Sequence, residues 1–239
     1  TTITRRTIDD LDEICDLVSG LDISLWSIFF LVPIGRGKPE DEVTAEDFER
    51  VFAKMYAWSK YVHFDIKSTA APHYRRYVMQ RRLEESRAAS SAGKCPPGVV
   101  REQMLADSDG DGISRAPKAV NDGNGLVFVS HTGDIYPSGF LPMSAGNVRY
   151  RSLVTTYRED PLFQQLRDYD HLLGKCGHCE YRNVCGGSRA RTFALTQKLM
   201  EAEPFCSYIP PSYSKLVAAG QELAPEEYFR TRMGASAGH

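Results

Sequence analysis

Four cysteines crowd the C-terminal third of the chain, and their spacing constrains the fold more than any other feature does. They follow the pattern C-x2-C-x5-C-x20-C and are Cys176, Cys179, Cys185 and Cys206. A disulfide scaffold would be short and rich in cysteine, whereas this chain has 239 residues and 6 cysteines. The uneven distribution favours metal binding, because two cysteines three residues apart can bind one metal centre from a single turn.

The kind of metal centre stays open from the spacing alone. A structural zinc site with four cysteines prefers two close pairs, and here twenty residues separate the third cysteine from the last. Gly177, Gly186 and Gly187 adjoin the cysteines and would let backbone amides approach the thiolates, which tunes an iron–sulfur cluster. The spacing favours an iron–sulfur centre over zinc, with unligated buried thiols as a third interpretation.

Charge and composition argue against several other classes of protein. The formal net charge is -2, from 29 Lys+Arg against 31 Asp+Glu, so no strong field favours nucleic acid or an acidic membrane. No apolar run approaches the roughly 20 residues of a spanning helix, and the polar start is not typical of a signal peptide. We therefore expect a cytoplasmic protein. Cys15 is expected in a helix core, and Cys95 is expected to be a spare thiol.

The first ninety or so residues alternate strand and helix patterns. Strands are expected at 1–4, 25–32 and 62–67, and helices at 10–20, from Thr44 onward and at 74–89. The apolar run at 25–32 predicts a strand covered on both faces, and the series predicts a right-handed parallel α/β layer. It is too short for a closed barrel of about 250 residues. Because the chain opens on a strand stub at Thr1 and not on Met, we expect further strands to be missing before it.

The character of the sequence changes after the last of these helices. Gly, Pro, Ser and Asp dominate 90–125, which predicts a linker or a long loop. An acidic run from Asp107 resembles the start of a calcium loop, but Lys118 stands where an EF-hand needs glutamate, which favours a solvated loop. A hairpin within 126–136 and a short amphipathic helix at 160–167 are expected before the cysteines.

Polar side chains gather at the end of the strand expected at 62–67. His63, Asp65 and Lys67 lie on its polar face, and the loop that follows leads to His73. In parallel barrels the loops at the carboxyl ends of strands build the active site. Lys67 and this loop are therefore candidates for substrate contact, with an ordinary solvated loop as an equally weighted alternative.

Several segments resemble one known family. GKCGHCEYRNVCGGSRARTFA at 174–194 and PFCSYIP at 204–210 resemble the auxiliary-cluster domain, of the SPASM/Twitch type, of radical S-adenosylmethionine enzymes. GLVFVSHTGDIYPSGFLPMSAGNVR at 125–149 is similar to the hairpin before that cluster. FFLVPIGRG at 29–37 and KSTAAPHYRR at 67–76 are similar to the last strands and loops of the family's partial barrel. The resemblance is closest to the branch of the alternative haem synthases, the haem d1 proteins and the mycofactocin maturase.

The resemblance implies one auxiliary [4Fe–4S] cluster with the four clustered cysteines as its full ligand set. A full SPASM domain holds two clusters, and two positions where it carries further cysteines are Ser138 and Arg189 here. The C-x3-C-x2-C triplet that holds the cluster that cleaves S-adenosylmethionine does not occur in the sequence. This agrees with a missing N-terminal half, and we expect the chain alone not to cleave S-adenosylmethionine.

The implied fold is α/β: the second half of a partial (β/α) barrel, followed by a small hairpin-plus-helix auxiliary domain. The expected parts are the barrel portion 1–92, a linker 93–124, the auxiliary domain 125–212 and a tail 213–239. Substrate contacts are implied for Lys67, His73, Tyr74, Arg75 and Arg115, and cofactor contacts for Pro33, Gly35 and Arg36. Arginine suits substrate carboxylates because it binds them through two hydrogen bonds.

For the intact enzyme the resemblance implies a second [4Fe–4S] cluster that reduces S-adenosylmethionine to a 5′-deoxyadenosyl radical. The implied electron donor is a ferredoxin or a flavodoxin, and the implied substrate is a tetrapyrrole or a ribosomal peptide that undergoes oxidative decarboxylation or related chemistry. Two other classes stay open: a non-catalytic iron–sulfur protein that transfers electrons or binds a partner, and a zinc-stabilised structural module. The gene sequence upstream of Thr1 and metal analysis would distinguish them.

Overall fold

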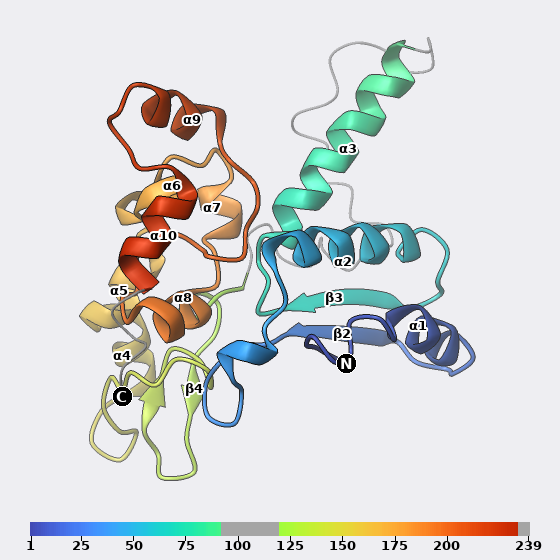
Figure 1. The fold of residues 1–239 in the computed structure, drawn as a ribbon. Coiled ribbons are helices and arrows are strands. Elements are labelled where there is room, and N and C mark those ends of the chain that lie inside the picture. The colour runs from blue at the N-terminus through green and yellow to red at the C-terminus, as the bar shows by residue number, and fades with distance from the viewer. Residues whose placement is uncertain (92–119, 234–239) are drawn as a thin grey trace.

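The computed structural model of the chain describes residues 1–91 and 120–233 (Figure 1). The first stretch forms a parallel α/β layer, and the second forms a hairpin followed by a group of short helices. Cys95, the acidic run that begins at Asp107 and the predicted substrate contact Arg115 all lie outside the described residues.

The α/β layer is built on a three-stranded parallel sheet in the order β1-β2-β3. Its elements are β1 (Thr2–Ile3), α1 (Leu11–Ser19), β2 (Leu25–Phe30), η1 (Pro39–Asp41), α2 (Ala45–Trp58), β3 (Asp65–Thr69) and α3 (Tyr74–Ser91). Leu25 pairs with Asp65 and Phe29 with Thr69, which sets the register between β2 and β3. The mixed α/β class and the predicted order of strands and helices in this stretch are confirmed.

Local chemistry explains where α2 begins and where β3 begins. The Thr44 hydroxyl accepts a 3.2 Å hydrogen bond from the amide of Asp47, whose carboxylate accepts a 3.0 Å bond from the amide of Thr44. This capping box satisfies two amides that the first turn leaves free. The strand expected at 62–67 starts three residues later, because the amide of Val62 bonds to the carbonyl of Trp58 at the end of α2.

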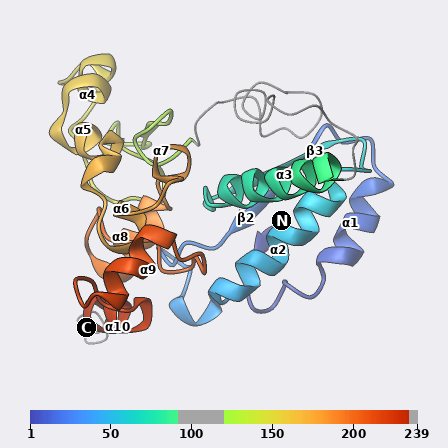
Figure 2. The ribbon, with the colours of Figure 1, turned by 90° about the horizontal axis from the view of Figure 1, so that it is seen from above.

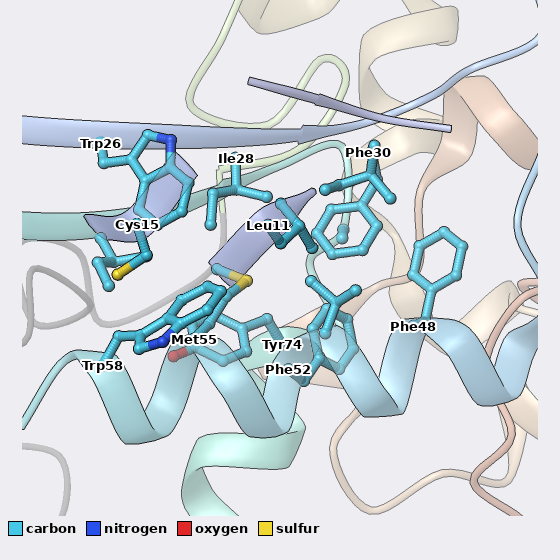
Figure 3. Close-up of a cluster of buried hydrophobic side chains, with 14 of the residues drawn as sticks. Leu11, Cys15, Trp26, Ile28, Phe30, Phe48, Phe52, Met55, Trp58 and Tyr74 are labelled. Carbon is cyan, nitrogen blue, oxygen red and sulfur yellow. The ribbon is translucent and has the colours of Figure 1, made fainter. Parts of the chain in front are cut away.

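The main hydrophobic core lies between one face of the sheet and the three helices (Figure 3). Trp26 and Phe30 of β2 point into it and are 4% and 0% exposed. The Phe30 ring lies against Phe48 and Phe52 of α2, with ring centroids 4.6 and 5.4 Å apart. Cys15 of α1 is buried in the same core, as its helix face predicts.

The opposite face of the sheet differs from the expectation that β2 is covered on both sides. Leu25 is 44% exposed, and Ser27 is also exposed. The side chains of β2 therefore alternate between core and surface, because α1, α2 and α3 pack on the same face. Toward the end of β2 the open face meets the second stretch, where the rings of Phe29 and Phe140 lie 5.0 Å apart.

The second stretch begins with an antiparallel hairpin and continues as short helices (Figure 1). Its elements are β4 (Phe128–Val129), β5 (Ile135–Tyr136), α4 (Leu153–Glu159), α5 (Pro161–Arg167), η4 (Tyr169–His171), α6 (Gly174–Gly177), α7 (Arg182–Cys185), α8 (Arg189–Thr196), α9 (Pro211–Ala218) and α10 (Pro225–Met233). The predicted hairpin and the predicted helix at 160–167 are confirmed. The other helices escape a search for periodicity because each spans only one to three turns.

A second core cluster joins the two stretches. Val32, just after β2, packs in it with Leu166 of α5, with Tyr169 and with Met200. Helix α3 also contacts α7, and Figure 2 shows the short helices lying to one side of the α/β layer. The end of β2 and the start of α3 therefore both face the cysteine-rich segment.

In the part of the chain that the structure describes, no helix combines the length and the apolar character needed to cross a membrane.

Candidate metal centre

The four clustered cysteines line a single cavity, although the last of them is distant in sequence from the others. Cys176 lies in α6, Cys185 ends α7, and Cys179 lies between these helices. Cys206 comes from the segment between α8 and α9, which returns to the same cavity. The cavity is open to solvent on one side, and its empty space, with this open part included, is about 400 Å³. The short helices therefore bring together the four residues that the spacing singled out.

Backbone amides hydrogen-bond to each of the four sulfurs. The amide of Glu203 lies 3.3 Å from Cys176 Sγ, and the amide of Gly187 lies 3.4 Å from Cys185 Sγ. The thiol of Cys179 accepts from the amide of Tyr181, and the thiol of Cys206 accepts from the amide of Tyr208. Three of these amides lie two residues after the cysteine that they serve. Amides arranged in this way stabilise thiolates, and in iron–sulfur proteins such hydrogen bonds shift the reduction potential of the cluster.

Two consecutive glycines make the turn after Cys185 possible. Gly186 and Gly187 both adopt left-handed backbone conformations, with φ values of 70° and 65°. A Cβ atom on Gly186 would lie 2.6 Å from the Tyr169 ring, and one on Gly187 would lie 2.4 Å from Nη2 of Arg189. Only glycine fits here without strain, and the turn directs the amide of Gly187 back to the thiol.

Burial and mutual repulsion disfavour free thiolates in this cavity. Burial raises the pKa of Cys179 to about 12 and raises that of Cys185 well above its ordinary value, and the neighbouring cysteines add to both shifts. Burial also raises the pKa of Cys206, against the opposing charges of Lys175 and Arg76. Thiols with raised pKa values would release protons when a metal centre binds, so binding and deprotonation are coupled.

Positive side chains surround the cysteines. Lys175 is 5% exposed, donates to the carbonyl of Cys206 and lies 5.2 Å above the Phe229 ring. Arg76 is 4% exposed, pairs with Glu49 and lies 5.2 Å from the centre of the Tyr208 ring. Both cations line the cavity and suit a centre that carries net negative charge.

The arrangement of the sulfurs bears on the kind of metal. Among the described residues, no three His, Cys, Asp or Glu side chains form a group that could hold one metal ion. In a zinc site the four sulfurs would each lie about 2.3 Å from a single ion. Four cysteines spread around a cavity instead fit a larger inorganic body with one iron for each thiolate. The four thiolate donors around one cavity fit an iron–sulfur cluster.

The structure separates the residues for which the sequence predicts substrate contacts. Lys67 is exposed in the middle of β3, on the open face of the sheet. Arg75 is partly buried at the start of α3 and is electrostatically coupled to Cys185. His73 is buried and lines the cysteine cavity, whereas Tyr74 packs in the main core against Phe52. Tyr74 therefore serves packing in this structure.

The residues for which the sequence predicts cofactor contacts form one turn after β2. Pro33 is partly buried, and Gly35 and Arg36 are exposed. Gly35 has a φ of 63°, which explains the need for glycine at this turn. The turn follows the carboxyl end of a parallel strand, where loops carry ligand contacts in α/β folds.

Sequence inspection missed the charged residues that join the cluster segment to the sheet. Arg191 of α8 is completely buried and lies 3.5 Å from carboxylate oxygens of both Glu42 and Glu203. Glu203 accepts a 2.7 Å hydrogen bond from the amide of Ser188. In sequence these side chains have no pattern that distinguishes them from surface residues, so no local signal marks them.

The two positions that depart from the full SPASM pattern, Ser138 and Arg189, are both buried and hydrogen-bonded. Arg189 is 0% exposed, and its Nη1 atom donates to the carbonyls of Leu199 and Glu201 at 2.6 and 2.9 Å. Ser138 is 2% exposed, and its hydroxyl accepts from the amide of Phe140. Neither side chain lines the cysteine cavity.

Comparison with known proteins connects this site to a class of enzymes. The chain is 35% identical over 210 residues to an AdoMet-dependent heme synthase of Methanosarcina barkeri, a match that covers 88% of the chain and 55% of the relative. It is 36% identical over 212 residues to an AdoMet-dependent heme synthase of Oleidesulfovibrio alaskensis, which covers 88% and 50%. A PqqA peptide cyclase of Granulibacter bethesdensis is 30% identical over 133 residues, which covers 50% and 34%. No protein-family model matches the chain.

These matches confirm the resemblance to radical S-adenosylmethionine enzymes. Within that class, the chain is related to the branch of the AdoMet-dependent haem synthases. The chain spans about half the length of the curated relatives it matches.

Proposed function

We propose that this chain is a portion of a radical S-adenosylmethionine oxidoreductase or maturase and that it carries one auxiliary [4Fe–4S] cluster. Cys176, Cys179, Cys185 and Cys206 are the proposed ligands. The observation that carries the proposal is that all four line one cavity, each with a backbone amide directed at its sulfur. The relatives, which are named for a dependence on AdoMet, support the radical chemistry.

Each part of the chain has its own role in the proposed function. The proposed layout is a barrel portion at 1–92, a linker at 93–124, an auxiliary domain at 125–212 and a tail at 213–239. The cluster, when bound, would exchange single electrons with the reaction centre, and a ferredoxin or flavodoxin would supply electrons to the intact enzyme. Lys175 and Arg76 offset the negative charge of the thiolates, and the amides hold the sulfurs in place.

The turn after β2 is the proposed contact for S-adenosylmethionine, through Pro33, Gly35 and Arg36. The open sheet face and the start of α3 are the proposed contacts for substrate. Lys67 and Arg75 provide positive charge for carboxylates there, and Arg115 is proposed to join them. The proposed substrate is a tetrapyrrole or a ribosomal peptide that undergoes radical oxidative decarboxylation or related chemistry. The relatives are named for heme synthesis and for the cyclisation of a peptide, which supports these two substrate classes.

Anaerobic reconstitution of the chain with iron and sulfide tests the cluster directly. We expect about four irons and four sulfides per chain and a brown absorbance that dithionite bleaches. A colourless chain that binds one zinc per molecule would contradict the proposal and favour a structural zinc module. A loaded chain that exchanges electrons with flavodoxin, but has no role in any S-adenosylmethionine reaction when joined to the remainder of the enzyme, would favour an electron-transfer protein instead.

A further inference from the structure

His73 is a buried histidine beside the cysteine cavity. It lies immediately before α3, its side chain is 1% exposed, and it lines the cavity together with the four cysteines. Its ring is held between two aromatic rings of α2, stacked on Phe48 at 5.1 Å and edge-on to Phe52 at 4.9 Å. The imidazole is therefore fixed in orientation and shielded from water.

Within the described residues, neither Nδ1 nor Nε2 of His73 makes a hydrogen bond of ordinary geometry. The backbone of Phe205, the residue before Cys206, lies near enough to raise the pKa of His73 through a hydrogen bond that falls outside that geometry. Buried polar groups in native proteins almost always have partners, so an unpaired imidazole beside a metal cavity points to a partner within that cavity.

The surroundings keep the ring in its neutral form. Burial holds the pKa of His73 well below its ordinary value, and the charges of Arg191, Arg76 and Lys175 act in the same direction. A neutral imidazole carries one N–H donor. The cations Arg76 and Lys175 that line the cavity can only donate. The Glu203 carboxylate, which also lines it, already accepts hydrogen bonds from the amides of Ser188 and Phe205. The cysteine sulfurs are therefore the main acceptors left for the ring N–H.

We propose that His73 donates its ring N–H to a sulfur atom of the iron–sulfur cluster that the four cysteines hold, and that it thereby raises the reduction potential of the cluster. This inference rests on the proposed function. A hydrogen bond to cluster sulfur stabilises the reduced state more than the oxidised state, because the reduced cluster carries one more negative charge. His73 is then a residue that tunes the cluster and not a substrate contact.

Replacement of His73 in the reconstituted full chain tests the proposal. His73→Phe keeps a flat ring between Phe48 and Phe52 but removes the donor, and His73→Gln retains an N–H. We expect His73→Phe to lower the ratio of reduced to oxidised cluster at fixed potential about tenfold, which lowers the reduction potential by about 59 mV for a one-electron couple, and a rise would contradict the inference. His73→Gln should lie between His73→Phe and the wild type. His63→Phe, at an exposed histidine that does not line the cavity, is the matched control and should leave the potential unchanged.

A second measurement needs no change at His73. In a chain labelled with 15N-histidine, pulsed EPR of the reduced cluster should detect coupling to one imidazole nitrogen. His178 lies between two proposed ligands but does not line the cavity, and its ring bonds to Glu222 at 3.2 Å. The coupling should therefore persist in His178→Gln, and its absence from the wild type or its loss in that variant would overturn the inference.

The outcomes separate this inference from the proposed function. A wild-type chain that takes up no iron and sulfide overturns the proposed function, and this inference with it. A chain with His73→Phe that binds a full cluster at the wild-type potential overturns the inference alone. If His73→Phe does not fold, the labelled wild-type chain decides the question.

Discussion

The guanidinium of Arg191 donates a 2.9 Å hydrogen bond to the carbonyl oxygen of Leu31, a residue 160 positions earlier in the chain. A second bond of 3.3 Å reaches the carbonyl of Phe30, at the end of β2. The same side chain pairs with Glu203, whose amide bonds to the sulfur of Cys176. One buried cation thus connects the segment that holds the cysteines to the strand end that precedes the proposed cofactor turn.

Replacement of this cation should destabilise the whole chain. Arg191→Met would remove the cation that lies 3.5 Å from the buried acids Glu42 and Glu203, together with the donor to two backbone carbonyls. The loss of one partner from a buried ion pair costs about 3–5 kcal/mol. We expect a loss of this size in anaerobic urea unfolding followed by circular dichroism. Arg158→Met, at an exposed position on α4, is the control and should change stability by less than about 0.5 kcal/mol. Equal effects of the two variants would contradict the role assigned to Arg191.

Glu42, on the other side of Arg191, gives the chain a pH dependence with a definite sign. Burial raises the pKa of Glu42 from 4.5 to about 7, although the charge of Arg191 opposes the rise. The folded chain keeps this proton up to about pH 7, whereas the unfolded chain releases it above pH 4.5. Stability therefore falls as pH rises through this window, by up to about 3 kcal/mol from this group.

Two variants test this pH dependence, one at the buried Glu42 and one at the exposed Glu40. Glu42→Gln removes the titration and should reduce the difference in unfolding free energy between pH 5 and pH 8 relative to the wild type. Glu40→Gln replaces a carboxylate whose side chain is 68% exposed two residues earlier, and it should leave that difference unchanged. A pH profile that is the same in Glu42→Gln and in the wild type would show that Glu42 does not titrate in this range.

The sequence was sufficient to predict the parts of the fold that depend on local signals. The helix start at Thr44, the apolar stripe of α2 and the alternation around Ile66 act over a few residues, so a pattern search finds them. The first three cysteines of the cavity are within ten residues of one another, and the resemblance to the auxiliary-cluster domain implies the fourth, Cys206, in the same ligand set.

Long-range contacts explain what the sequence could not predict. The burial of Arg191 depends on β2, and the burial of His73 depends on Phe48 and on the segment that carries Cys206. No window of ten or twenty residues contains both partners of such a contact, so an arginine or a histidine in sequence is indistinguishable from a surface residue. The same limit explains why both faces of β2 were expected to be covered, since its apolar run does not reveal which neighbours it meets.

Removal of a single proposed ligand should prevent assembly of the cluster. Cys179→Ala leaves three thiolates, and we expect reconstituted chains to contain less than half of the wild-type iron and to lose most of the visible absorbance. Cys15→Ala is the matched control, because Cys15 is 3% exposed in the main core and is remote from the cavity. It should cost about 1–2 kcal/mol of stability through lost packing but keep full iron content. Loss of iron in both variants would point to general instability and not to ligation.

Gly187 and Gly220 separate the effect of backbone conformation from the effect of crowding at the metal centre. Both have left-handed φ values, 65° and 67°, so an alanine at either position costs about 1–2 kcal/mol in backbone strain. At Gly220 a Cβ atom would meet nothing within 4 Å, whereas at Gly187 it would lie 2.4 Å from Arg189 and 3.1 Å from Glu203. Gly187→Ala must therefore displace either the Arg189 side chain or the Gly187 amide that bonds to Cys185 Sγ, and we expect the amide to move because Arg189 is fully buried.

We accordingly expect Gly220→Ala to lower the unfolding free energy by about 1 kcal/mol without any change in iron content. Gly187→Ala should lower stability further and should also weaken cluster binding, measured as faster loss of visible absorbance under a chelator. Because the two glycines share the same backbone conformation, the comparison isolates the effect of crowding at the metal centre. If both variants release iron at the wild-type rate, the amide of Gly187 does not support the cluster, and the short contact with Arg189 is relieved by movement of that side chain.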